Sequence, residues 1–362
     1  MADLQPLAFT STDERAKYAE LEAAVGPDAA RVDWLTAKLT IRCKQDFAFF
    51  CRNILGYAQM LPEHDALCRW FQDQPSAMKL VLMPRYSFKS SIGTIGYTLW
   101  TLLRNPNDRI LIYSDTAEKA QGFLLEIKNH LLGGVAGQGF RQLTHAQPWE
   151  VDPQQQTWNQ EAIVIAARTH AQREPSVDTA GVETSRVGMH YDRLLFDDLV
   201  SDKNVTTPEQ LDKVAACFQK ALSLLKPGGE VVLIGTRWHF GDLYGQLLSR
   251  PDKYPNFASY VRQAEGDATD GTRYPFEAIG LTRAFLAQQR AIQGDYVYSC
   301  LYQNEPVSDQ DATFRLRDFA WYPPKALPDG LFITCCLDPI PPHERTQGDD
   351  AALTVCGTDA EL

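Results

Sequence analysis

The sequence predicts an α/β fold in which a mostly parallel sheet is flanked by helices. Two observations predict it. Between about residues 78 and 236, short apolar runs typical of strands alternate with amphipathic stretches typical of helices, which favours parallel strands joined by helical crossovers. With 362 residues, of which 44% are apolar and 22% charged, the chain can also bury one large core or two ordinary ones.

Helices are expected through most of residues 1–60, and the alternating part begins near residue 78. A hairpin is expected at 157–166, and two helices near 281–292 and 294–302. The expected strands of the sheet lie at 78–83, 109–114, 193–196 and 230–236, and its expected helices at 90–104, 117–132 and 208–225.

Four regions follow from this pattern. They are an N-terminal helical region (1–60), the sheet domain (61–307), a polar linker (308–330) and the first strands of a second α/β domain (331–362). Two strands alone cannot bury enough surface to fold independently. We therefore expect the chain to be cut off inside this second domain.

The composition excludes several classes of protein. A net charge of −11 argues against a surface that coats nucleic acid, since such surfaces are usually basic, but it leaves room for a local basic groove. The eight cysteines form no CxxC pair, which favours buried free thiols in a reducing compartment over a zinc site. No signal peptide and no apolar run of about 18 residues is found, so we expect a soluble, intracellular protein with no membrane partner.

The stretch MPRYSFKSSIGTIGY, residues 83–97, lies between an expected strand and an expected helix. A phosphate-binding loop needs a tight turn there, with a lysine for the phosphates and a hydroxyl for Mg²⁺ at the start of the helix. Lys89 and Ser90 occupy these two positions, but Met83 and Phe88 stand where the usual pattern has glycines. Taken alone, the stretch also fits a serine N-cap that opens an ordinary helix.

Two later segments place polar residues at the ends of strands. YDRLLFDDLVSDKN puts Asp197 and Asp198 where one carboxylate can hold Mg²⁺ and its neighbour can orient an attacking water. GGEVVLIGTRWHFGD ends a strand near Thr236, a place from which a polar residue can sense a γ-phosphate. The alternatives are an acidic cap on a loop and a turn in which His239 is a surface residue. Their position after the strand–Lys-Ser–helix unit favours a nucleotide site.

The ordered set of segments resembles the ATPase part of phage large terminase subunits. The segments are PRYSFKSS, RILIYSDTAEKAQ, REPSVDTAGVETSRVGMHYDRLLFDDLV and VVLIGTRWH, and the stretch 272–307 is similar to the segment that ends that domain. The resemblance covers roughly residues 45–362. It implies a P-loop fold of the ASCE/RecA-like type and an ATP-hydrolysing motor that moves double-stranded viral DNA into a procapsid.

The resemblance also implies roles for individual residues. Asp197 would be the metal carboxylate, Asp198 would stand at the catalytic-carboxylate position, and Thr236 would belong to a coupling segment. Many relatives carry glutamate where this chain has Asp198, so the water-positioning role rests on a side chain one methylene shorter. The residues expected to bind the phosphates and Mg²⁺ of ATP are Arg85, Lys89, Ser90 and Ser91.

Two further roles are implied outside these motifs. In ring-shaped motors of this family an arginine from the neighbouring subunit completes the site, and Arg173 and Arg186 are the candidates, with ordinary surface residues as the alternative. The family contacts the adenine just before the first strand. Glu63 and His64 are therefore candidates for base recognition, and a plain surface helix is the alternative.

The tail resembles the opening of the family's second domain, an RNase H-like nuclease. CCLDPIPPHERTQGDDAALTVCG puts Asp338 at the end of a strand and Asp349 with Asp350 before another. Two-metal cleavage of DNA needs several carboxylates that hold ions about 4 Å apart. Since Asp338 alone is not sufficient, we expect no nuclease activity, and a second divalent-metal site only in a complete nuclease domain.

The leading hypothesis is therefore a terminase motor in the host cytoplasm that uses ATP and Mg²⁺. Its expected partners are double-stranded DNA, the portal protein and the small terminase subunit, and it would form a homo-oligomeric ring on the portal while being a monomer in solution. One alternative is a helicase-like or recombination P-loop ATPase. Another takes the missing glycines literally, as a non-hydrolysing nucleotide-fold scaffold that binds a portal or small terminase partner.

Overall fold

The computed structural model describes residues 12–132, 157–184, 186, 188–266, 273–306, 331–338 and 352–358. The chain divides into two compact units, Met1–Ser308 and Asp309–Leu362, and each is treated by itself. The predicted linker and the pair Asp349 and Asp350 lie outside the described residues. None of the described helices is long and apolar enough to span a membrane.

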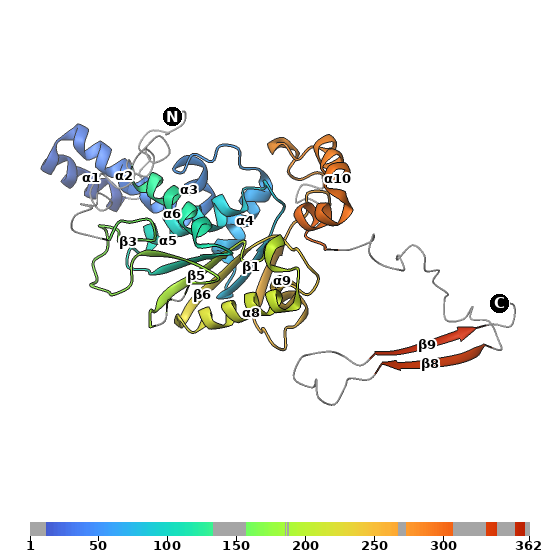
Figure 1. Ribbon diagram of the computed structural model, residues 1–362. Helices are drawn as coiled ribbons and strands as arrows, with labels where there is room; N and C mark the ends of the chain where they lie inside the picture. The colour runs from blue at the N-terminus through green and yellow to red at the C-terminus, as the bar shows by residue number, and fades with distance from the viewer. Residues whose placement is uncertain are drawn as a thin grey trace. The chain divides into compact units, whose positions relative to one another are not determined.

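A seven-stranded sheet forms the centre of the first unit (Figure 1). Its strand order is β3-β4-β2-β5-β6-β1-β7, and all neighbouring strands are parallel except β3, which is antiparallel to β4. The strands are β1 (Met78–Leu82), β2 (Ile110–Ser114), β3 (Ala162–Ile163), β4 (Val177–Gly181), β5 (Tyr191–Asp197), β6 (Leu225–Gly235) and β7 (Phe257–Val261). The predicted fold class, a mostly parallel sheet flanked by helices, is confirmed.

Helices cover both faces of this sheet (Figure 1). On one face lie α3 (Phe47–Asn53), α4 (Pro62–Asp73), α5 (Tyr97–Arg104) and α6 (Ala117–Leu132), and on the other α8 (Pro208–Leu222) and α9 (Leu243–Ser249). The remaining described helices are α1 (Thr12–Val25), α2 (Pro27–Gln45), the π-helix η1 (Ser91–Gly96), the 3-10 turns η2 (Asp202–Asn204) and η3 (Glu277–Ile279), α10 (Arg283–Tyr298) and the π-helix η4 (Ser299–Gln303).

Successive side chains of each central strand enter opposite cores, because side chains alternate along a strand. In β1, Val81 packs with the helices α3–α6, whereas Leu80 and Leu82 pack with α8 and α9. In β6, Ile234 belongs to the first core and Leu233 to the second, and all of these residues are fully buried. The near-continuous apolar runs of the sequence are thus explained by burial on both faces.

The order of the strands decides which loops meet at the carboxyl edge of the sheet. β6 lies between β1 and β5, and the register pairs Leu82 with Gly235 and Asp197 with Ile234. The loop after β1, the residue after β6 and the end of β5 are therefore neighbours. A crevice beyond the carboxyl ends of parallel strands is where α/β sheets commonly bind ligands.

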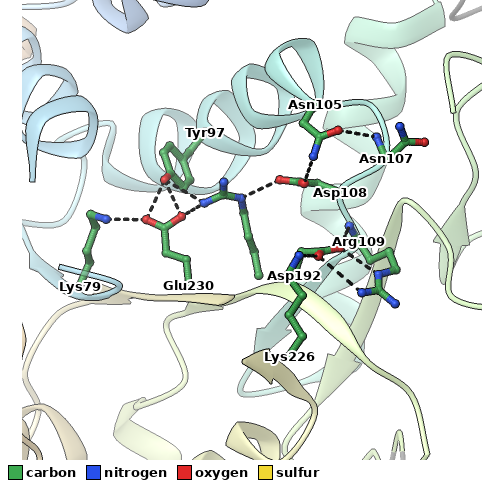
Figure 2. Close-up of polar contacts among 10 residues, drawn as sticks. Lys79, Tyr97, Asn105, Asn107, Asp108, Arg109, Asp192, Lys226 and Glu230 are labelled. Carbon is green, nitrogen blue, oxygen red and sulfur yellow. Dashed lines mark hydrogen bonds and ion pairs between the residues drawn. The ribbon is translucent and has the colours of Figure 1, made fainter. Parts of the chain in front are cut away.

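A network of buried charges lies at the opposite, amino edge of the sheet (Figure 2). Glu230 lies in the buried part of β6, and its carboxylate forms ion pairs with Lys79 of β1, at 2.5 Å, and with Arg193 of β5. The hydroxyl of Tyr97 in α5 donates to the same carboxylate at 2.8 Å. Arg193 in turn reaches Asp108 at 3.0 Å. One carboxylate thus links three strands and a helix.

A second group of charged residues, around Asp192, lies at the same edge of the sheet (Figure 2). Asp192 accepts from the backbone and the side chain of Arg109, at 2.8 and 2.9 Å, and pairs with Lys226. Arg109 also pairs with the buried Glu174 at 3.3 Å. Burial disfavours the charged form of Asp192, but the bonds from Arg109 and Lys226 outweigh it and keep the pKa of Asp192 below its ordinary value.

The second unit is described as one antiparallel hairpin of β8 (Phe332–Asp338) and β9 (Ala352–Thr358). Asp338 is the last residue of β8 and pairs in register with Ala352. The adjacent residues Cys335 and Cys336 are both exposed.

We expect Glu230→Gln to destabilise the first unit by about 3 kcal/mol, because removing one member of a buried ion-pair network leaves the others uncompensated. Burial, and then Arg193, already lower the pKa of Lys79 to about 8. Removing the negative charge of Glu230 would make the charged form of Lys79 still less favourable. Urea unfolding at pH 7 measures the difference. Glu118→Gln, on an exposed position of α6, is the matched control and should unfold like the wild type. Equal unfolding midpoints for the two variants would contradict the role assigned to Glu230.

Candidate nucleotide site

The loop between β1 and η1 has left-handed backbone at two residues that are not glycine. Two of its residues have positive φ angles, Tyr86 at 65° and Phe88 at 58°. This left-handed conformation is costly for bulky residues and is usually supplied by glycine. Phe88 is also the residue that stands at the second glycine position of the standard pattern. The loop thus has left-handed backbone at the second glycine position although the residue there is not glycine, and such strain is typical of functional sites.

Hydrogen bonds and a ring contact from α4 and η4 hold this loop in place. His64 of α4 lies fully buried, its Nδ1 accepts from the backbone N–H of Leu61 at 2.7 Å, and its Nε2 therefore donates to the carbonyl of Ser87 at 3.0 Å. The rings of His64 and Phe88 lie 5.8 Å apart, edge to face. On the other flank, the backbone N–H of Arg85 donates to the carbonyl of Leu301 at 2.9 Å.

This placement bears on the base-recognition role expected for His64 and Glu63, which stays a prediction. Both ring nitrogens of His64 are engaged within the protein, and burial lowers its pKa, so the ring is neutral and faces the loop. The carboxylate of Glu63, 2% exposed, accepts from Arg262 at 3.0 Å. α4 is thus packed against the sheet, and its side chains shape the loop. Because both ring nitrogens of His64 are engaged, we propose that His64 positions the loop.

Asp197 joins the end of β5 to the helix that follows the loop. Its side chain is fully buried, and its two oxygens accept from the hydroxyls of Ser90, at 3.0 Å, and of Thr94. Burial and the adjacent Asp198 raise the pKa of Asp197 to about 7, against the lowering effect of Thr94, Lys89 and Ser90. Sequence reasoning did not single out Thr94, although it follows Ser90 by four residues and so lies on the same face of the helix.

Lys89 and Asp198 face each other across the site. The Nζ of Lys89, which is 7% exposed, lies 3.8 Å from the Oδ1 of Asp198. This oxygen is shielded from solvent and lacks a hydrogen-bond partner. Asp198 has a φ of 46°, and its backbone N–H donates to the carbonyl of Ile234 in β6 at 2.8 Å. Left-handed backbone and a shielded oxygen without a hydrogen-bond partner at one position are features that occur together at functional sites.

Thr236 lies at the same site, directly after the end of β6. It is buried, follows the last residue of the strand, and lines a cavity of about 300 Å³ together with Arg85, Lys89 and Asp198. The segment after it wraps the buried carboxylate of Asp242, which accepts from the backbone N–H of Trp238 at 3.0 Å and of His239 at 3.1 Å. The ring of His239 accepts from Gly241 and lies against Phe240, as expected of a turn residue.

The side-chain oxygens of Ser90 and Asp197 suit a nucleotide-bound Mg²⁺. In the described part of the chain, no cluster of three or more His, Cys, Asp or Glu residues could hold a metal ion by itself. Mg²⁺ does not need one, because it usually takes one or two carboxylates and completes its shell with water and substrate phosphates. The hydroxyl of Ser90 and the carboxylate of Asp197 lie 3.0 Å apart and supply oxygen ligands of this kind. Ser91, half-buried, begins η1 next to them.

The remaining predicted site residues lie apart from this group. Neither Arg173 nor Arg186 lines the cavity that holds Lys89 and Asp198. Arg186 is tied to its own β4, since its guanidinium donates to the carbonyl of Thr179 at 2.7 Å and lies 3.2 Å from Asp178. Arg173 is exposed and donates to the carbonyl of Gly188 at 3.3 Å. Asp338 belongs to the second unit and is described only within its hairpin.

We expect the stability advantage of the wild type over His64→Gln to shrink as the pH falls below about 6.5. The pKa of His64 is lowered in the folded protein, so in that range the unfolded chain binds a proton that the folded chain does not. Acid therefore favours unfolding through His64, and a glutamine cannot titrate. Urea unfolding of both proteins at pH 7.5 and 5.5 measures this, since the other histidines are common to both. A difference that does not change with pH would contradict a neutral, buried His64.

Comparison with known proteins gives likenesses of fold only. The sequence matches no family model and no curated protein. Among solved structures, the large terminase ATPase domain of Thermus phage P74-26 is similar at 12% identity and a TM-score of 0.41, over 71% of this chain and 97% of that chain. The large terminase of a second thermophilic bacteriophage, in complex with ATP-γ-S, is similar at 9% identity and a TM-score of 0.41, over 68% of this chain and 53% of that chain. In its fold, the chain is similar to phage large terminase ATPase domains.

Proposed function

We propose that this chain is an ATP hydrolase, the ATPase part of a large terminase subunit that drives double-stranded DNA into a procapsid. One observation carries the proposal. Ser90 and Lys89, from the loop after β1, meet Asp197 and Asp198, from the end of β5, beside a loop with left-handed backbone at Tyr86 and Phe88. The order of sequence motifs that resembles this family, which includes segments beyond these residues, supports the same activity.

The geometry supports a division of labour for hydrolysis. Lys89 would neutralise the β- and γ-phosphates, while the N–H groups of the bent loop cradle them. Ser90 and Asp197 would hold Mg²⁺, which would neutralise charge on the phosphates. Asp198 would accept a hydrogen bond from the attacking water and orient it, since its Oδ1 is shielded and lacks a partner. In the nucleotide-bound state Lys89 would exchange its contact with Asp198 for the phosphates.

Coupling would pass through the segment after β6. Thr236 lies in the same cavity as Lys89 and Asp198, and so is placed to sense the γ-phosphate. The segment is bonded to the last helices of the unit, because the hydroxyl of Tyr296 donates to the carbonyl of Trp238 at 2.5 Å. A shift at Thr236 would therefore reach α10 directly. Two-state movement of such an element is how ATP hydrolysis is converted into displacement of a partner.

The proposed partners are those of a packaging motor: double-stranded DNA, the portal protein, the small terminase subunit and further copies of this chain in a ring. The ring requires an arginine that reaches a neighbouring subunit. Arg173 suits this role better than Arg186, because Arg173 is exposed whereas Arg186 is held by Asp178 and Thr179 of its own chain. A helicase-like or recombination ATPase would share the nucleotide site and would differ in translocating on single strands.

We expect Lys89→Ala to lower ATP hydrolysis by roughly 10²–10³-fold through weaker binding and catalysis. Asp198→Asn should lower kcat to a similar degree but leave the affinity for ATP within about threefold, because it removes the water-positioning group and keeps the phosphate ligands. Steady-state hydrolysis and equilibrium binding, with and without DNA, separate the two effects. Lys220→Ala, on an exposed position of α8, is the control. Complete inactivity of the wild type would instead favour the non-hydrolysing scaffold.

We expect Arg173→Ala to lower kcat by about 10³-fold, the effect typical of an arginine that acts between subunits. The wild type should show a specific activity that rises with protein concentration. Mixing Arg173→Ala with Lys89→Ala protein should restore part of the activity, because some sites in a mixed ring combine an intact Lys89 with an intact Arg173. Activity that does not depend on concentration, together with no recovery on mixing, would remove the case for Arg173.

A further inference from the structure

A second cavity lies on the other flank of the phosphate loop. Its volume is about 320 Å³, and it opens between the loop and the last two helices of the first unit, α10 and η4. It is lined by Arg85, Tyr86, Phe285, Gln289, Gln293 and Tyr302. Three aromatic rings and two amides in one cavity, next to a site for phosphates, form the environment of a nucleobase, which needs stacking surfaces and a few placed polar groups.

We propose that this cavity binds the base of the nucleotide and selects adenine, an inference that rests on the proposed ATPase function. The place is consistent with one ligand bound on both sides of the loop. Arg85 lines this cavity and also the cavity of Lys89 and Asp198. Glu63 and His64, where the sequence suggested base contact, have their polar groups engaged within the protein.

The aromatic residues supply the stacking surface. Tyr86 is 63% exposed, although a large ring in so constrained a loop would be expected to pack against the protein. On the other side, the rings of Phe285 and Tyr302 lie 6.3 Å apart at 82°, and the backbone N–H of Ala264 fixes η4 by donating to the carbonyl of Tyr302 at 2.7 Å. A flat base between Tyr86 and this wall would cover apolar surface on both of its faces.

The two amides supply the selectivity. The Nε2 of Gln293 donates to the Oε1 of Gln289 at 2.6 Å, which leaves the Oε1 of Gln293 without a partner although it is shielded from solvent. The pair thus offers one free acceptor, on Gln293, and free N–H donors, on Gln289. If both amides are turned over, the two roles exchange and the pair still offers one of each.

This combination matches adenine and not guanine. Adenine presents an amino donor beside a ring-nitrogen acceptor, whereas guanine presents two acceptors, O6 and N7, on the corresponding edge. A guanine oxygen facing the Oε1 of Gln293 would leave both acceptors unpaired, which is costly in a shielded site. The backbone holds Gln293 in place, because Gly294, with a φ of 80°, ends the first part of α10 directly after it and turns the chain towards η4.

The test compares three probes that share the phosphates and differ in the base. Binding of AMP-PNP, GMP-PNP and inorganic tripolyphosphate, each with Mg²⁺, is measured by calorimetry on the full chain. The wild type should prefer AMP-PNP over GMP-PNP by roughly tenfold or more. Tyr86→Leu and Gln293→Ala should each weaken AMP-PNP by roughly tenfold and leave tripolyphosphate within about twofold. Gln293→Ala should also abolish the preference over GMP-PNP.

Gln288→Ala, an exposed neighbour on α10 outside the cavity, is the matched control and should behave as the wild type. Since Tyr86 is exposed, its variant tests the cavity without loss of core packing. Equal weakening of AMP-PNP and tripolyphosphate would show that the substitutions distort the loop, and would overturn the base site. An unchanged preference for AMP-PNP in Gln293→Ala would overturn it as well.

The same data separate this inference from the proposed function. If the wild type binds none of the three probes, or if Lys89→Ala leaves tripolyphosphate binding unchanged, the nucleotide site itself fails and the base site falls with it. If the probes bind through Lys89 but the cavity variants alter neither affinity nor preference, only the base site is overturned.

Discussion

The bond between Asp197 and the hydroxyls of Ser90 and Thr94 is the contact on which the site depends. It fixes the end of β5 to the first turn of the helix after the phosphate loop, so that parts of the chain about a hundred residues apart share one buried carboxylate. The strand order makes this reach short, because only β6 separates β5 from β1. The charge network around Glu230 clamps the same strands at their amino ends, which leaves the carboxyl edge in a defined register.

The strain in the loop after β1 is offset by packing. Left-handed backbone at Tyr86 and Phe88 costs of order 1–3 kcal/mol per residue. In return, Phe88 contributes to the core beside His64, and the loop gains the bonds from His64 to Ser87 and from Arg85 to Leu301. A glycine would relieve the strain and lose the aromatic packing. Glycine is thus one way for a loop to adopt left-handed backbone. The lack of glycines in this loop does not exclude a nucleotide site.

Features carried by local periodicity could be predicted from the sequence, and features set by distant contacts could not. The central strands, the helix 117–132 and the break at Gly294 follow from apolar pattern and turn residues. β4 was missed because VDTAG carries Asp178, which is tolerated inside the sheet only through its bonds to Tyr191 and Arg186. In the site, Lys89, Ser90 and Asp197 were expected from their positions at element ends. The burial of His64 depends on Ser87, 23 residues later, and nothing local indicates it.

The last helices of the first unit connect the two ends of the proposed ligand. η4 bonds to the loop through Leu301 and Arg85, α10 bonds to the coupling segment through Tyr296 and Trp238, and the same two helices form one wall of the proposed base cavity. A base in that cavity would hold α10 against the loop, whereas loss of a γ-phosphate would act on it through Thr236 and Trp238. The two contacts act on different parts of α10, which meet at the kink at Gly294. Hydrolysis would change only the contact at Tyr296, so the second part of α10 would move relative to a base that the first part keeps bound. Movement of one part against the other is the asymmetry that a motor needs in order to convert a chemical step into displacement.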